Sequence, residues 1–90
     1  MLFEWDPDKA KSNVRKHRVT FHEAATALGD PLGWTYPDPD HSEGERRWLT
    51  IGQSEKQRLL VVSHTDMNDT GRIISAREAT RKERRFYEKG

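Results

Sequence analysis

One uninterrupted apolar run, Leu59-Leu60-Val61-Val62, most limits what this chain can fold into. Successive residues of a strand point to opposite faces, so a strand containing this run is apolar on both faces. We therefore predict a strand over 58–64 at the centre of a sheet, with helix packed on one side. Charged residues make up 34% of the 90 residues and hydrophobic residues 32%, which allows one thin core and predicts a single domain over 1–90.

Polar links divide the rest of the second half of the chain into further strands. These strands are predicted over 33–36, 46–52 and 72–77. The links over 53–57 and 65–71 are short and polar, and links of this length join antiparallel neighbours, so the four strands should form an antiparallel meander. Alternation along the last strand would place Ile73, Ser75 and Arg77 on one face.

Two helix-start signals follow one another in the first thirty residues. Asp6 is a good N-cap and Pro7 a good first helical residue, so a helix is predicted to about residue 17. Its inward face would be formed by Ala10, Val14 and His17. Thr20 and Glu23 have capping-box spacing and predict a second helix that ends at Gly29. The two helices should therefore form a helical hairpin.

A further capping box, Thr80 with Glu83, predicts a last helix that runs to about Glu88. A short strand over 2–5 precedes the helical hairpin. The predicted order is β-α-α-β-β-β-β-α. This is an α+β fold in which an antiparallel sheet packs against the helical hairpin and the C-terminal helix lies at one end.

Charge is distributed unevenly, although the formal net charge is only +1. Residues 30–45 contain five acidic residues and no Lys or Arg, whereas residues 72–90 contain seven basic and three acidic residues. A basic end of this kind binds anions locally. The structural alternative is a solvated helix face whose arginine stems pack on the core. Because the chain has no cysteine and the sequence contains neither an export signal nor a membrane span, we expect a cytoplasmic protein.

Arg77 and Arg81 are the strongest candidates for binding phosphate. We expect them to converge where the last strand meets the last helix, because two guanidinium groups beside the backbone N–H groups of a helix N-terminus suit a phosphate. The structural alternative is that Arg77 pairs with Glu83 or Glu78. Further contacts to phosphate or RNA are expected from Arg72, Arg84, Arg85 and Lys56.

His64, Glu83 and Tyr87 are candidates for moving protons. His64 ends the predicted central strand, where an imidazole can face a cleft, although a histidine at a strand end is more often a hydrogen-bonded surface residue. The four histidines show no metal-ligand spacing, so neither a metal site nor another cofactor is expected. Three aromatic residues could stack on bases but are more often part of a core: Trp34, Tyr36 and Trp48.

RNA suits this limited set of groups because it supplies its own nucleophile, the ribose 2′-OH. The protein then has to position the phosphate, stabilise the extra negative charge of the pentacoordinate state and move protons. Arginines can do the first two tasks. DNA has no 2′-OH and should be left intact.

Short stretches along nearly the whole chain occur in an order typical of one family. The most specific is Arg72-Ile73-Ile74-Ser75-Ala76-Arg77, followed by Ala79-Thr80 and Glu83-Arg84. The others are Phe3-Glu4-Trp5-Asp6-Pro7, Lys9-Ala10, Asn13, Lys16-His17, Val19-Thr20-Phe21, Glu23-Ala24, Arg47, Ile51-Gly52 and Tyr87-Glu88. In these stretches the chain resembles the BrnT family, the ribonuclease toxins of bacterial type II toxin–antitoxin modules.

The resemblance implies a RelE-like fold and a cytoplasmic ribonuclease that arrests translation. It also implies a BrnA-like antitoxin of the ribbon-helix-helix type and binding of operator DNA by the toxin–antitoxin complex, mainly through the antitoxin. One departure is Arg18, where a glycine is expected after Lys16-His17; Arg18 has to end the helix differently or adopt a left-handed conformation.

Two other functions remain open. The basic end could dock nucleic acid or an acidic partner without cleaving it. A relative with a RelE-like fold could instead poison a protein target such as gyrase.

Overall fold

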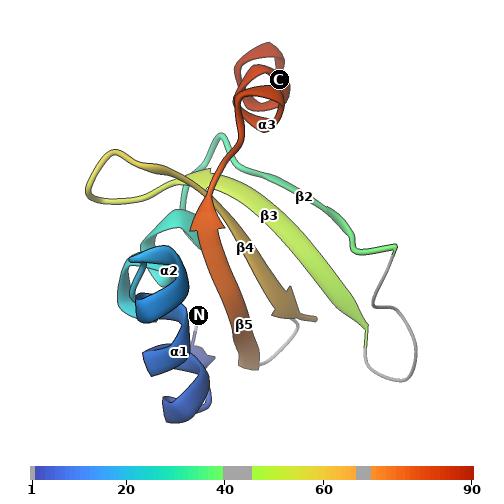
Figure 1. The fold of residues 1–90 in the computed structure, drawn as a ribbon. Coiled ribbons are helices and arrows are strands. Elements are labelled where there is room, and N and C mark those ends of the chain that lie inside the picture. Colours follow the sequence, from blue (N-terminus) through green and yellow to red (C-terminus); the bar gives the residue numbers. More distant parts are fainter. Residues whose placement is uncertain (1, 40–45, 67–69) are drawn as a thin grey trace.

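The structure is a computed structural model that describes residues 2–39, 46–66 and 70–90. Its elements follow the predicted β-α-α-β-β-β-β-α order, and each observed element begins and ends within about two residues of the predicted one (Figure 1). They are β1 (Leu2–Glu4), α1 (Pro7–His17), α2 (Phe21–Leu28), β2 (Trp34–Pro37), β3 (Arg47–Gln53), β4 (Leu59–Thr65), β5 (Thr70–Glu78) and α3 (Arg81–Lys89).

The strands form one sheet in the order β1-β5-β4-β3-β2. Strands β2 to β5 make the predicted antiparallel meander, and β4 lies at its centre. Strand β1, for which the sequence predicted no partner, pairs parallel with β5, with Phe3 opposite Gly71. Local sequence patterns cannot predict this pairing, because the partner strand lies almost seventy residues further along the chain.

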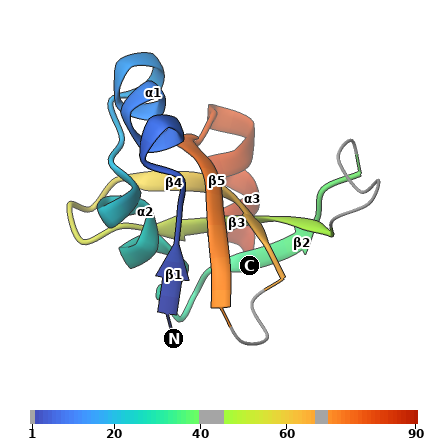
Figure 2. The same ribbon diagram turned by 90° about the horizontal axis from the view of Figure 1, so that it is seen from below.

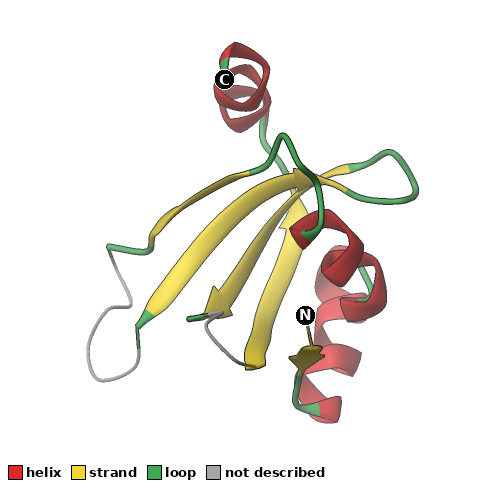
Figure 3. Ribbon diagram, turned by 180° about the vertical axis from the view of Figure 1, so that it is seen from behind, coloured by secondary structure: helices red, strands yellow, loops and turns green. Residues whose placement is uncertain are grey.

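The apolar run of β4 divides between two faces of the sheet, as predicted. Leu60 and Val62 face α1 and α2, and we call this the helix-pair face. Leu59 and Val61 belong to a smaller apolar cluster on the opposite side, the α3 face. Helix α3 lies on that side, near the end of β5, and α1 and α2 lie together on the other (Figures 1 and 3). Among the described residues, no helix combines the length and apolarity needed to cross a membrane.

The helix-start signals form the caps that they predict, with one exception. Asp6 accepts a hydrogen bond from the backbone N–H of Asp8, and Thr80 and Glu83 make the reciprocal bonds of a full capping box. Thr20 caps α2, but the carboxylate of Glu23 accepts hydrogen bonds from Ser54 and Arg58 instead of completing a box. A hydrogen bond to a charged partner is stronger than one to the N-cap backbone, so the buried carboxylate of Glu23 turns to Arg58.

Arg18 adopts the left-handed conformation that a glycine would usually take. Its φ of 58° ends α1, and its backbone N–H donates to the carbonyl of Val14. The carbonyl of Arg18 accepts a hydrogen bond from Arg58. A side chain from the β3–β4 hairpin therefore holds the turn that the missing glycine would have made easier.

The buried face of α1 is not the predicted one. Asn13 is buried, whereas Val14 is 39% exposed and His17 is exposed. The amide of Asn13 donates to the carbonyls of Val19 and Ala76 and accepts from the backbone N–H of Ala76. It thus pairs with the edge of β5 beyond the point where β1 ends, and these backbone groups determine which side of α1 is buried.

A β-bulge in β5 changes which residues share a face from what strict alternation predicts. Ser75 pairs with Ser63 but Ile73 pairs with His64, so Ile74 is an extra residue on β5. Ile73 consequently lies with Ala76 in the core of the helix-pair face and not on the face of Arg77. Strict alternation fails wherever one strand has a residue more than its neighbour.

Candidate functional site

A groove of about 460 Å³ lies between the α3 face of the sheet and α3. Strands β2 and β3 supply one wall, and the start and inner face of α3 supply the other. The lining residues are Tyr36, Ile51, Thr80, Lys82, Glu83 and Phe86. We call this the α3 groove. In it, the predicted site residue Glu83 comes together with the aromatic side chains of Tyr36 and Phe86.

An ion pair between Arg77 and Glu83 borders the groove. The guanidinium Nη1 and Nη2 donate to the two carboxylate oxygens at 2.8 and 2.9 Å, and the backbone N–H of Thr80 donates to the same carboxylate at 2.8 Å. The Arg77 hydrogen bonds, with that of Thr80, outweigh burial and lower the pKa of Glu83 to about 2. Arg77 therefore makes the pairing that the structural alternative expected.

Tyr36 lies close enough to this pair to be affected by its charges. Burial is the main reason that its pKa is raised, and the negative charge of Glu83 raises it further, while Arg77 acts in the opposite direction. A raised pKa means that the phenol keeps its proton at neutral pH. The groove thus has a fixed cation at its border and, in its lining, a hydroxyl that can donate a hydrogen bond.

The structure does not bring Arg81 to Arg77. Glu83 and Tyr87 are half-buried on the inner side of α3, whereas Arg81 is exposed. At about 100° per residue, Arg81 points almost opposite to Glu83 around the helix axis. The expected convergence fails because Glu83 holds Arg77 on the inner side of the first turn. Arg84 and Arg85 are exposed on α3 as well.

Tyr87 makes a hydrogen bond to Asp30 next to the α3 groove. Its hydroxyl donates to Asp30 Oδ2 at 2.6 Å, and this hydrogen bond is the main reason that the pKa of Tyr87 is raised. The bond ties α3 to the end of α2. The two remaining predicted RNA contacts lie elsewhere. Lys56 is exposed in the β3–β4 turn, and Arg72 lies near the other end of β5, opposite Glu4 in the register of β1 and β5.

His64 is buried on the helix-pair face, and both of its ring nitrogens have hydrogen-bond partners. It is 2% exposed, and burial is the main reason that its pKa is lowered. Its Nδ1 lies 2.8 Å from the carbonyl of Thr65, which only accepts, so Nδ1 carries the proton and Nε2 accepts from Thr50 at 2.6 Å. The side chains of His64 and Arg77 lie on opposite faces of the sheet. His64 is therefore hydrogen-bonded, as the structural alternative expected, but it is buried and not a surface residue.

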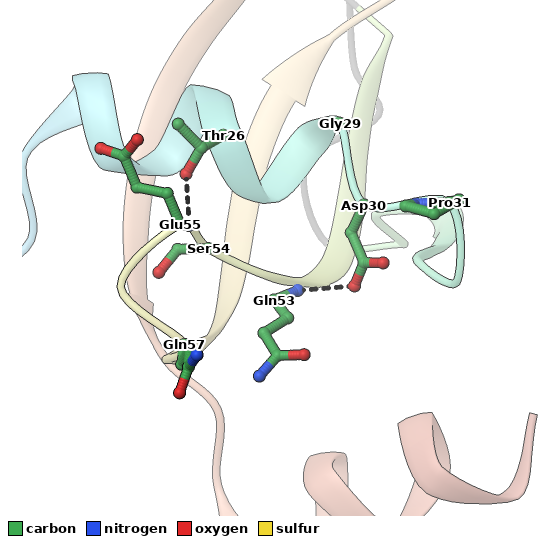
Figure 4. A pocket seen from close by; sticks show the side chains of 8 residues that line it. All are labelled: Thr26, Gly29, Asp30, Pro31, Gln53, Ser54, Glu55 and Gln57. Atoms are coloured by element: carbon green, nitrogen blue, oxygen red, sulfur yellow. Dashed lines mark hydrogen bonds between the residues drawn. The ribbon is translucent and has the colours of Figure 1, made fainter.

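A second pocket, of about 400 Å³, lies beyond the end of α2 (Figure 4). Its polar groups already bond to one another: the backbone N–H of Gln53 donates to Asp30, and that of Glu55 donates to Thr26. The carboxylates of Asp30 and Glu55 give this pocket a negative charge, which does not suit a phosphate.

Four lining residues of the groove were not named as site candidates from the sequence, and Tyr36 was considered only as a stacking residue. The four are Ile51, Thr80, Lys82 and Phe86. The spacing of Glu83, Phe86 and Tyr87 at i, i+3 and i+4 contains the signal for the inner face of α3. In the described ranges, no three His, Asp or Glu side chains gather in a way that could hold a metal ion.

Comparison with known proteins agrees with the fold and the resemblance. A family model described as "Ribonuclease toxin, BrnT, of type II toxin-antitoxin system" matches residues 5–83. This match places the chain in the class of ribonuclease toxins of type II toxin–antitoxin systems. Within that class, the chain belongs to the BrnT family.

A solved structure supports the same architecture. The fold is similar to that of the 1.1 Å crystal structure of the Brucella abortus ribonuclease toxin BrnT, with a TM-score of 0.67 and 20% sequence identity over 90% of this chain and 100% of that chain. At this identity the likeness concerns the fold. No curated protein sequence matches the chain.

Proposed function

We propose that this chain is an endoribonuclease that cleaves RNA through the ribose 2′-OH without a metal ion, and that this cleavage inhibits translation in the cytoplasm. The observation that supports the proposal is the α3 groove, which Tyr36 and Glu83 line and which the guanidinium of Arg77, bound to Glu83, borders closely enough for its charge to affect the Tyr36 phenol. Since the nucleophile belongs to the RNA, the protein does not have to generate one.

Arg77 is the group that we assign to the phosphate. Its three hydrogen bonds, two to Glu83 and one to the carbonyl of Glu78, use three of the five guanidinium donors. The other two can donate to the non-bridging oxygens, whose negative charge grows in the transition state. A cation already fixed in position stabilises that charge without reorganising.

Glu83 acts as a positioning residue in this proposal. Its pKa of about 2 makes the carboxylate a weak proton acceptor near neutral pH, which argues against the proton-carrying role expected from the sequence. Tyr36 is better suited to donate a hydrogen bond or a proton to the leaving oxygen. The 2′-OH gives up its proton to water as its oxygen bonds to phosphorus, and the bond from phosphorus to the 5′-oxygen breaks. The 5′-oxygen takes up a proton from Tyr36, whose phenolate then regains a proton from water, so the products are a 2′,3′-cyclic phosphate and a 5′-OH.

The outward-facing basic residues would attract RNA rather than contact the reacting phosphate. Arg81, Arg84 and Arg85 are exposed on α3, and an exposed cation contributes mainly through its field, which salt screens. Arg72 and Lys56 would extend this field from more distant positions. Arg81 would thus attract RNA through its charge, in place of the direct phosphate binding expected from the sequence.

Membership of a type II toxin–antitoxin family implies an antitoxin partner. We propose that this partner is a BrnA-like ribbon-helix-helix protein that covers α3 and the groove, and that the complex binds operator DNA mainly through the antitoxin. The excess positive charge of α3, with five basic and two acidic residues, suits an acidic partner segment.

The test is incubation of the purified protein with end-labelled RNA in EDTA, beside DNA and an RNA with 2′-deoxyribose at the cleaved positions. The proposal expects shortened RNA with 2′,3′-cyclic phosphate ends and intact controls. Cleavage that needs an added divalent ion, or that also occurs at deoxyribose, would contradict it. A module that only binds would retain intact RNA, and a gyrase poison would change plasmid supercoiling instead.

A further inference from the structure

Three aromatic rings form an exposed cluster at the edge of the α3 groove. Trp34 is 41% exposed and Phe86 is 50% exposed, although 34% of the chain is charged and most of its other large apolar side chains are covered. The Phe86 ring lies edge-to-face with Trp34 at 5.4 Å and with Tyr36 at 6.3 Å between centroids. We call Trp34, Tyr36 and Phe86 the aromatic platform.

The aromatic platform continues directly from the ion pair. Phe86 follows Glu83 by three residues and so lies on the same side of α3, and both residues line the α3 groove with Tyr36. Lys82 lines this groove too, and α3 as a whole has five basic and two acidic residues. A chain that offers a negative charge and a flat ring at every step would match both features at once.

We propose that the aromatic platform binds unpaired bases next to the phosphate at Arg77, so that the substrate is single-stranded RNA. The place of the phosphate rests on the proposed function. Bases inside a duplex are stacked and paired, and only unpaired bases can turn onto a protein ring. Stacking accepts any base, since every base has a π-face, so this contact selects strandedness more than sequence.

The test uses binding rather than cleavage. The probe is a short single-stranded RNA with 2′-O-methyl groups, which lacks the nucleophile and stays intact, beside the blunt duplex of the same sequence at equal salt. Phe86→Leu keeps an apolar side chain at this position but removes the ring. It should weaken binding of the single strand about five- to 150-fold and leave duplex binding nearly unchanged.

Two matched variants make the result specific. Phe86→Trp restores a ring and should bind almost like the wild type. Leu32→Ala shortens an aliphatic side chain that is 71% exposed beside Trp34 and should have little effect. Circular dichroism and thermal melting establish that each variant is folded.

Four results would overturn the inference. Phe86→Leu could bind the single strand as tightly as the wild type does, or it could lose as much affinity for the duplex as for the single strand. Leu32→Ala could lose as much affinity for the single strand as Phe86→Leu does, or Phe86→Leu could weaken only the binding of the antitoxin. Failure of RNA cleavage alone would contradict the proposed function and leave the binding result standing. Cleavage of single-stranded RNA at the wild-type rate by Phe86→Leu would contradict this inference and leave the proposed function standing.

Discussion

Glu83 accepts hydrogen bonds from both Arg77 Nη atoms and from the backbone N–H of Thr80, so one carboxylate caps α3 and orients the arginine of the groove. These two tasks couple the start of α3 to the end of β5. The cap predicted from sequence is therefore also part of the candidate site. An arginine held in this way has lost its rotamer freedom before a phosphate arrives.

The lowered pKa of Glu83 predicts a pH-dependent contribution to stability. The folded value of about 2 lies below the ordinary value of 4.5, so the contribution is complete above about pH 4.5 and is lost as the pH falls towards 2. Because Arg77 is 41% exposed, solvent screening limits the contribution to about 1–2 kcal/mol. Urea unfolding of wild type and Glu83→Gln at pH 6 and pH 2.5 measures it. A difference in unfolding free energy that is equal at both pH values would contradict this explanation.

A polar side chain, Asn13, adds hydrogen bonds to the apolar packing that attaches helix α1 to the sheet. Asn13 makes three hydrogen bonds to buried backbone groups of Val19 and Ala76, which act in place of a neighbouring strand. Helix α1 lies along β5 in this region (Figure 2). The position of α1 thus depends on satisfying the edge of β5 as well as on burying apolar surface.

Asn13→Ala should lower the free energy of unfolding by about 2–4 kcal/mol, because it leaves buried backbone groups without partners. Asn13→Asp should be similarly harmful, since a carboxylate can accept from Ala76 but cannot donate to the two carbonyls. Lys11→Ala, on the exposed side of the same helix, is the matched control and should change stability by less than about 0.5 kcal/mol. Equal stability of Asn13→Ala and Lys11→Ala in urea titrations would show that the bonds to β5 contribute nothing.

Signals confined to a few residues predicted the elements of this fold well. Asp6 with Pro7, and Thr80 with Glu83, fixed where α1 and α3 begin, and the apolar run of β4 gave the central strand. Long-range partners were not predictable from the same patterns. The parallel register of β1 and the burial of Asn13 depend on residues far away in the sequence. The bulge at Ile74 depends on how β5 pairs with the preceding strand β4, which the pattern of β5 alone does not show.

The same division applies to the candidate site. The pairing of Arg77 with Glu83 was one of two readings that the sequence allowed, and the structure has it. The position of Arg81 follows only once the inner side of α3 is known. His64 could be placed at a strand end but not on a face, because its face depends on the sheet around it.

Arg58 connects parts of the molecule that the sequence separates widely. It donates to the buried carboxylate of Glu23 on α2, to the carbonyl of Arg18 at the end of α1 and to Glu78 at the end of β5. Its hydrogen bond is also the main reason that the pKa of Glu23 is lowered. The helix pair, the β3–β4 hairpin and the strand that leads into α3 therefore meet at one guanidinium group.

Glu23→Ala should lower the free energy of unfolding by about 3 kcal/mol, since it leaves Arg58 and Ser54 without their shared acceptor. Glu55→Ala, which removes an exposed carboxylate in the neighbouring turn, is the control and should be almost neutral. Thermal melting and urea titration of both variants give the comparison. Similar midpoints for the two would mean that Arg58 does not hold these elements together.

The single-turnover cleavage rate of folded Arg77→Lys tests the central claim most directly. Lysine keeps the positive charge but loses the planar group that binds Glu83 and a phosphate together, so the rate should fall about a hundredfold, with Arg15→Lys on the exposed side of α1 as the control at the wild-type rate. Circular dichroism establishes that both variants are folded. A wild-type rate in folded Arg77→Lys would contradict the assignment of the α3 groove as the RNA-cleaving site.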